Sequence, residues 1–153
     1  MKKYQLLLFI ALSFVGCDRK TMLFIDNEGI AKTIHTSCGK VEVKAHMFGS
    51  SRLTITYNFK DGVHYFDPDM FKIGSFDPSN EVKKIHFRNY GYKETTDLKR
   101  DTIVSPRKIN ATIYLKNSSH VIKPPITFYI VPTNYLKCND KMAIKDTLYL
   151  HYR

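Results

Sequence analysis

Tryptophan is absent from this chain of 153 residues, cysteine occurs only three times, and glycine and proline are scarce, with seven and six copies. Acidic residues are also the minority: 14 Asp and Glu stand against 24 Lys and Arg, which gives a formal net charge of +10. No repeat, low-complexity block or internal linker divides the chain, so we expect a single domain. A chain of this length buries enough surface to fold without a metal ion or a partner.

Sequence patterns of known catalytic centres are also absent. The chain contains no Gly-x-Ser-x-Gly elbow, no Ser-x-x-Lys, no His-Glu-x-x-His and no glycine-rich phosphate loop. Its six histidines are scattered singly, and a lone histidine in a loop or on a polar strand face is usually a solvated side chain. We therefore predict that the protein is not an enzyme and has neither a cofactor nor a metal centre.

Helical periodicity is nearly absent, and apolar and polar residues alternate instead, which is typical of strands with one buried face. Six segments are predicted as strands: 41–47, 53–59, 84–88, 111–116, 126–131 and 148–152. Weaker patterns occur at 22–25, 63–66 and 71–73. Turn-forming residues separate these segments, so we predict an all-β fold, an antiparallel immunoglobulin-like β-sandwich. A small β-barrel is the alternative, because the sequence does not define the strand order.

The longest apolar stretch lies at the N-terminus. Met1-Lys2-Lys3 is positively charged, Tyr4 to Val15 contains no charged residue, and Gly16-Cys17 follows. A positive segment, an apolar core and a small residue before the cleavage point are the features of a secretory signal. The apolar core is shorter than the roughly 20 residues that span a bilayer.

With its Gly-Cys ending, this segment resembles the signal peptide of bacterial lipoproteins, in particular those of Bacteroidota. The resemblance implies that residues 1–16 are removed and that Cys17 becomes the lipidated first residue. It further implies a linker at 17–21, a domain at 22–153, and a lipid anchor in the cell envelope, at the outer membrane. Phe14 and Val15 depart from the Leu and the Ala or Ser usual in that family. An ordinary secretory signal or an uncleaved anchor is the alternative.

The two remaining cysteines, Cys38 and Cys138, form an even pair near the two ends of the domain. In an oxidising compartment such a pair predicts a disulfide, and the alternative is two buried thiols.

A concentration of basic residues between Lys83 and Lys108 is the strongest sign of a binding surface. Within it, alternation places Lys84, His86 and Arg88 on one outward face, with Tyr90 at its end. Cations beside aromatic rings suit phosphate or sugar ligands, so we predict an anionic-ligand surface here. The alternative is an edge strand on which basic residues prevent aggregation.

Three further short motifs have structural alternatives. Asp67 and Asp77 each belong to a Phe-Asp-Pro motif, and Asp69 follows the first of these motifs. The motifs predict turns or, alternatively, a calcium-binding loop. Thr102 and Thr147 each follow an Asp and precede an apolar residue, which resembles the O-glycosylation motif of Bacteroidota envelope proteins. The alternative for both threonines is the start of a strand.

Taken together, these patterns predict a lipid-anchored envelope lipoprotein that acts as a non-enzymatic binding or structural module. The expected partners are the membrane, through the N-terminal lipid, and an anionic envelope component or envelope protein. Nucleic acid is excluded by this location. The alternatives are a subunit of a secretion or surface assembly, or a small hydrolase or inhibitor.

Overall fold

The computed structural model describes residues 20–49, 51–90, 95–97, 101–104, 107–116 and 126–152. The elements within these ranges are β1 (Lys20–Ile25), β2 (Ala31–Thr36), β3 (Gly39–Phe48), β4 (Arg52–Phe59), β5 (Val63–Phe66), the short 3-10 helix η1 (Pro68–Met70), β6 (Ile73–Ser75), β7 (Val82–Tyr90), β8 (Thr95–Asp97), β9 (Asp101–Val104), β10 (Arg107–Leu115), β11 (Ile126–Ile130), β12 (Leu136–Cys138), β13 (Lys141–Met142) and β14 (Leu148–Tyr152). The described strand pairs are antiparallel, which confirms the predicted all-β antiparallel fold. Within these ranges, no helix is long and apolar enough to cross a membrane.

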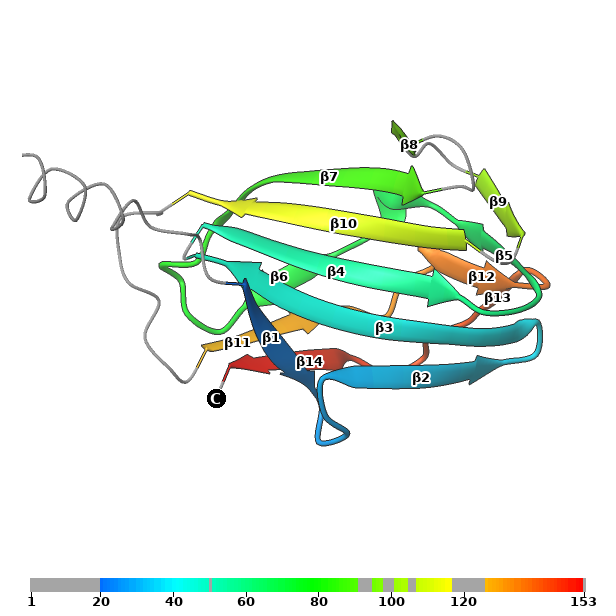
Figure 1. Cartoon of the computed structure of the whole chain (residues 1–153), viewed down its shortest axis with the longest axis horizontal. Helices are drawn as coiled ribbons and strands as arrows, with labels where there is room; N and C mark the ends of the chain where they lie inside the picture. The colour runs from blue at the N-terminus through cyan, green and yellow to red at the C-terminus, as the bar shows by residue number, and fades with distance from the viewer. Residues whose placement is uncertain are drawn as a thin grey trace, which may run out of the picture.

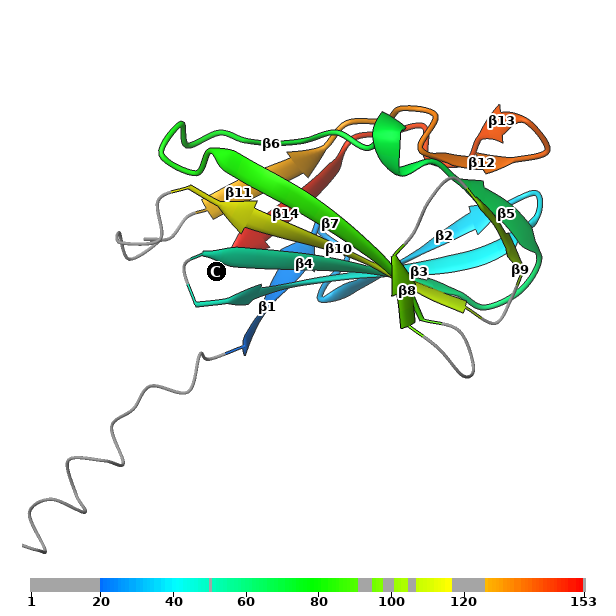
Figure 2. The same ribbon diagram turned by 90° about the horizontal axis from the view of Figure 1, so that it is seen from above.

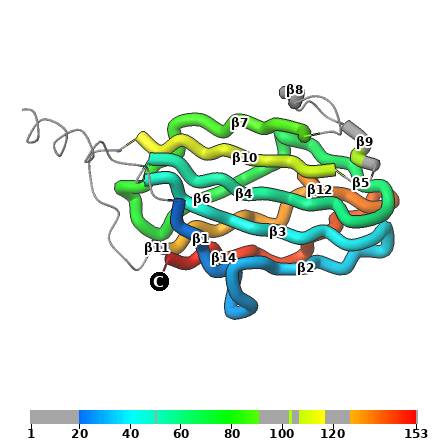
Figure 3. Tube along the Cα trace, in the orientation of Figure 1, coloured from blue at the N-terminus to red at the C-terminus, as the bar shows by residue number. Residues whose placement is uncertain are grey.

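The strands form two layers around one core (Figures 1 and 2). A ten-stranded sheet has the order β6-β11-β14-β1-β3-β4-β10-β7-β8, with β2 paired to β3, and a four-stranded sheet has the order β13-β12-β5-β9. The large sheet turns over at β1, so that its β6-β11-β14 end lies across the core from β3, β4, β10 and β7 (Figure 3). The fold is therefore a sandwich whose layers share a strand, which makes it partly barrel-like.

Strand β1 connects the two layers because its two halves have different partners. Residues 20–23 pair with β3, whereas Phe24 and Ile25 pair with β14. The strand begins at Lys20, so Lys20 and Thr21 belong to the domain and not to the predicted linker. Thr21 lies opposite Met47, and this pairing extends the sheet beyond the start at residue 22 that the apolar pattern indicated.

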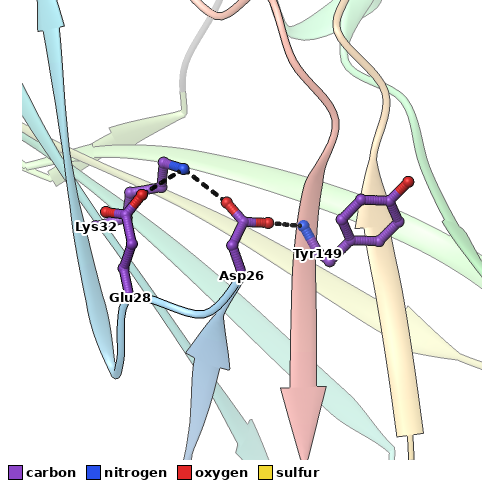
Figure 4. Close-up of polar contacts among 4 residues, drawn as sticks. All are labelled: Asp26, Glu28, Lys32 and Tyr149. Carbon is purple, nitrogen blue, oxygen red and sulfur yellow. Dashed lines mark hydrogen bonds and ion pairs between the residues drawn. The ribbon is translucent and has the colours of Figure 1, made fainter.

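The turn that follows β1 is held by charged side chains (Figure 4). Asp26 has a φ of 51°, and its Oδ1 accepts a hydrogen bond from the backbone N of Tyr149 at 2.8 Å. Lys32 Nζ lies 2.7 Å from Asp26 Oδ2 and 2.8 Å from Glu28 Oε1. The two carboxylates raise the pKa of Lys32 although its partial burial opposes this. These contacts join the β1–β2 turn to β14, where the sheet turns over.

The core follows the predicted alternation. The inward residues of β3 are Val41, Val43, Ala45 and Met47, and those of β4 are Leu53, Ile55, Tyr57 and Phe59. They meet a cluster of buried aromatic rings whose centroids lie 5.2–6.0 Å apart with their edges toward each other's faces. The members of this cluster are Tyr57, Phe66, Phe71, Phe87 and Tyr135. The same side chains thus fill the space between the two layers.

All six strands predicted with a clear pattern are present, and so are the weaker ones at 22–25 and 63–66. The weak prediction at 71–73 was displaced: β6 occupies Ile73–Ser75, because the backbone N of Phe71 instead closes η1 on Pro68 O at 3.2 Å. Strands β2, β8, β9, β12 and β13 were not predicted. Most of them are too short to show alternation, and β2 contains few apolar residues.

The predicted Cys38–Cys138 disulfide is present, with a Cα–Cα distance of 5.7 Å across a sequence separation of 100 residues. Cys38 lies in the β2–β3 turn and Cys138 at the end of β12. The β4–β5 turn also packs against Cys38. Gly62 in this turn has a φ of 80° and lies so close to Cys38 O that a side chain would not fit there. Three hairpin ends are thereby joined at one end of the sandwich.

Candidate functional site

The outer face of the large sheet carries polar residues in rows that cross its long strands. The register of β3, β4, β10 and β7 defines one row as His46, Thr54, Thr112 and His86. The next row is Lys44, Thr56, Asn110 and Arg88. These rows alternate with the core rows, so each side chain in them points away from the second layer.

The rows and their neighbours surround a hollow with a volume of about 560 Å³, called the basic hollow below. In the view of Figure 2, β8 and the first residues of β1 lie below β4 and β10, whereas β6, β12 and β13 lie above. The polar face is therefore on the side of β4 and β10 away from β6, β12 and β13. Five basic residues line the basic hollow: Lys20, Lys44, Arg52, Arg88 and Lys108.

The floor of the basic hollow is polar and nevertheless nearly closed to solvent. His46, Thr54 and Thr56 are only 8%, 5% and 6% exposed, although they lie on the outer face of the sheet. Thr56 Oγ1 donates a hydrogen bond to Asn110 Oδ1 at 3.0 Å. Removing polar groups from water costs free energy unless they find partners. A ligand with its own donors and acceptors would supply such partners here.

Among the residues that the structure describes, the lining of the basic hollow contains no Asp or Glu, so this described lining carries positive charge only. Glu42 borders the basic hollow, in the same row as its lining residues Asn58 and Lys108. Its carboxylate lies 2.9 Å from Lys44 Nζ and 3.9 Å from Lys60 Nζ, and Asn58 donates a hydrogen bond to it at 3.1 Å. The hydrogen bond from Lys44 is the main reason why the pKa of Glu42 is lowered. The other four basic residues form no ion pair with any side chain that the structure describes.

Aromatic rings hold two of these cations at opposite ends of the basic hollow. Arg52 Cζ lies 4.5 Å from the centroid of the Phe48 ring, and Lys108 Nζ lies 5.6 Å from that of Tyr90. A cation over an aromatic face is attracted by the ring quadrupole and keeps its charge available to solvent. Both ends of the basic hollow therefore present a fixed positive charge.

His46 is a neutral member of this site. Burial is the main cause that lowers its pKa to about 4, and the positive charges of Lys20, Lys108 and Arg52 contribute to the same shift. Its ring lies edge-on to Phe48, with centroids 4.8 Å apart. At neutral pH the side chain can thus donate and accept a hydrogen bond without adding charge.

The structure brings most of the predicted basic row to this site. His86, Arg88 and Tyr90 line the basic hollow, whereas Lys84 lies on the same face outside it. Strand β8 pairs with β7 at residues 88–90, so Arg88 and Tyr90 are not on a free edge. Lys84 lies in the part of β7 that pairs with β10 alone among the described strands. Edge protection therefore remains an interpretation for Lys84.

Sequence reasoning missed the contribution of β1, β3, β4 and β10 to the basic hollow. Their polar alternation was visible, for example at Lys44 and His46, but it was interpreted only as a solvated face. The signal that would have connected these residues is the register between strands, which depends on the fold.

The remaining predicted sites lie elsewhere. Asp67 Oδ1 accepts a hydrogen bond from Asp69 N at 3.1 Å, and Asp77 Oδ1 accepts one from Ser79 N at 2.9 Å, as expected of turn residues. The described ranges contain no group of three or more His, Cys, Asp or Glu arranged to hold a metal ion. Thr102 lies in β9 opposite Tyr65, and Thr147 directly precedes β14. Cys17 lies outside the described residues, and the predicted modifications stay predictions.

Comparisons of the chain with models of protein families, with curated proteins and with solved structures found no match. The chemistry of the basic hollow is therefore the basis for a functional assignment.

Proposed function

We propose that the protein is a lipid-anchored, non-enzymatic binding module of the bacterial cell envelope, and that the basic hollow binds an anionic ligand. The observation that carries this proposal is a recess whose described lining contains five Lys or Arg side chains and no Asp or Glu. The resemblance of residues 1–17 to a lipoprotein signal supports the location, and the Cys38–Cys138 disulfide suits an oxidising compartment.

The composition of the floor favours binding over catalysis. Its central side chains are threonines and an asparagine, which donate and accept hydrogen bonds but do not exchange protons at neutral pH. His46 and His86 stand in the same row but on β3 and β7, with two strands between them, about 14 Å apart at the usual strand spacing. Among the described residues that line the basic hollow, no carboxylate is present to orient the His46 imidazole as a general base.

The first prediction is that reversing two charges in the basic hollow weakens anion binding strongly. Arg88→Glu with Lys108→Glu should weaken binding of inositol hexakisphosphate by at least about tenfold, since each charge contributes on the order of 1 kcal/mol. Isothermal titration calorimetry of the full-length protein across a salt series measures this, and uncharged inositol is the ligand control. Affinity should fall steeply with salt, because exposed charges are screened within about 8 Å at physiological ionic strength.

A matched control variant separates a site from net charge. Lys72→Glu with Lys145→Glu makes the same change in charge at two exposed positions outside the basic hollow. It should change the affinity by less than about threefold. Equal losses in the two double variants would mean that the protein attracts anions only through its overall charge, and the site proposal would then be wrong.

A second candidate function is favoured by a group of aromatic residues on the outer face of the second layer, called the aromatic strip below. Phe76 is 67% exposed, and its ring centroid lies 5.0 Å from that of Tyr129 and 6.3 Å from that of Tyr149. Exposed apolar patches of this kind occur at protein–protein contacts. This surface suits a subunit of an envelope assembly. In that case Phe76→Ser should reduce chemical cross-linking of this protein to its partner protein. The Arg88→Glu, Lys108→Glu variant should leave that cross-linking intact.

A further inference from the structure

We infer that the anionic ligand of the basic hollow is the membrane itself, namely the phosphate groups of the lipid layer that holds the anchor. This inference rests on the proposed function, because it requires both the lipid on Cys17 and anion binding by the basic hollow. It adds the identity of the ligand and the orientation of the domain. The sandwich would lie with its recessed polar face against the bilayer.

The first argument is the position of Lys20. It is the first residue of β1, it is exposed, and it lines the basic hollow. Cys17 precedes it by three residues, and a fully extended chain spans at most about 3.6 Å per residue. A lipid on Cys17 therefore holds one rim of the basic hollow within about 11 Å of the membrane interface. No other described surface is tied so closely to the anchor.

The second argument is the distribution of charge from that rim inward. Lys20, Phe48 and Arg52 occupy one row on three neighbouring strands, so the positive end nearest the anchor contains two cations. Three further basic residues follow along the strands toward Lys108. Because the Debye length is about 8 Å at physiological salt, a tether of this length holds Lys20 and Arg52 near the range of an anionic surface. Lys108 comes into that range when the polar face lies against the bilayer.

The third argument is the size of the basic hollow. From the row of Arg52 to the row of Lys108, the sheet extends six residues along β4, or about 20 Å at the rise of an antiparallel strand. Cations lie at both ends of this distance, over Phe48 and over Tyr90. Such a surface can contact several phosphate groups at once, as a lipid layer presents them, whereas a small free anion would occupy only one end.

Aromatic side chains provide a built-in test of orientation, since hydroxyl radicals modify them when they are accessible. Phe48, Tyr90 and Tyr114 line the basic hollow, whereas Phe76 and Tyr149 belong to the opposite layer. The full-length lipidated protein is reconstituted into vesicles of phosphatidylcholine alone or of phosphatidylcholine with phosphatidylglycerol. Modification is then measured residue by residue by mass spectrometry.

On the anionic vesicles we expect at least threefold protection of the three residues in the basic hollow relative to neutral vesicles. Phe76 and Tyr149 should react equally on both. Protection should disappear in 0.5 M salt and in the Arg88→Glu, Lys108→Glu variant. A twenty-residue Gly-Ser spacer between Asp18 and Arg19 should leave it in place, because the headgroups hold the domain. Loss of protection with the spacer would show that the tether alone orients the domain, and the inference would be wrong.

The remaining outcomes separate this inference from the proposed function. Equal reactivity of the basic hollow on both vesicle types, or protection of the aromatic strip instead, would overturn the membrane-facing orientation. If inositol hexakisphosphate still binds and the double variant still abolishes that binding, the anion site stands and its natural ligand is a soluble anion. If neither vesicles nor the soluble anion bind, both proposals are wrong.

Discussion

His46 illustrates how a single polar residue acquires unusual properties on this sheet. Its position in β3 is an outward one by alternation, yet the neighbouring strands and Phe48 leave it 8% exposed. Three cations surround it, on β1, β4 and β10, and His86 shares its row on β7. The imidazole is therefore kept neutral both by burial and by positive charge. An anion bound in the basic hollow would offset the second of these effects.

We expect the domain to become less stable as the pH falls from about 6.5 to about 4. In this interval the unfolded chain binds a proton on His46 that the folded protein does not, because the folded pKa is about 4. The loss should be on the order of 2 kcal/mol after allowing for solvent screening at the open side. Burial also lowers the pKa of His64, so this histidine should add to the loss of stability at low pH.

Urea denaturation of the wild type and of His46→Gln at pH 7 and pH 4.5 measures this difference. The variant should lose clearly less stability between the two pH values, whatever its stability at pH 7. Identical losses would show that His46 is protonated in the folded protein. A bound anion should raise the pKa of His46, which can be followed by NMR titration.

At the scale of elements, the alternation of apolar and polar residues was sufficient to locate the long strands. It succeeded in β3, β4 and β10 because apolar side chains face the core and polar side chains face away from it, even where the polar ones, such as Thr54 and Thr56, are themselves buried. It failed for β12 and β13, which are too short to show a period. The basic row of β7 was visible in the sequence, but its companions on β3 and β4 were not, since β10 enters between β4 and β7 from a distant part of the chain.

The hairpin ends at the disulfide predict a strong dependence on Gly62. Its φ of 80° is unfavourable for other residues, and a Cβ there would lie 1.5 Å from Cys38 O. Gly62→Ala should therefore cost about 3 kcal/mol or more, from backbone strain together with displacement of the β2–β3 turn. Gly29→Ala is the control: its φ of 122° is also unfavourable, but no atom lies within 4 Å of its Cβ position.

Thermal or chemical denaturation of the two variants measures these costs. Gly29→Ala should lose about 1–2 kcal/mol, the cost of the backbone conformation alone. If Gly62→Ala is no less stable than Gly29→Ala, the β4–β5 turn does not pack against Cys38 in the way described.

The molecule as a whole presents two different surfaces on opposite sides of one core. One is the basic hollow, on the face of the sheet to which Lys20 contributes, and the other is the aromatic strip around Phe76. This pairing suits a protein that is held at a charged surface on one side and free to meet a protein on the other. The net charge of +10 predicts an anionic partner, and only the fold shows that five basic residues gather on one face of the sheet.

Removal of the Cys38–Cys138 disulfide should lower the stability of the whole domain. The bridge closes a loop with a sequence separation of 100 residues, for which the chain-entropy model gives about 4–5 kcal/mol. Denaturation of the Cys38→Ala, Cys138→Ala variant measures the loss. Inositol hexakisphosphate binding should persist under native conditions, since neither cysteine lines the basic hollow. A loss below about 1 kcal/mol would contradict this prediction. Reaction of Cys38 or Cys138 of the wild type with an alkylating reagent before reduction would contradict it as well.

Strand β1 also determines how the domain responds to mechanical force. Any pull exerted through the segment that precedes Lys20 enters along the axis of this strand. Its hydrogen bonds to β3 and β14 run across that axis, so they are loaded together in shear and do not open one after another. The element that joins the two layers is thus also the element that resists extraction of the chain. With the lipid anchor proposed above, a domain built in this way would withstand tension at its tether without losing its first strand.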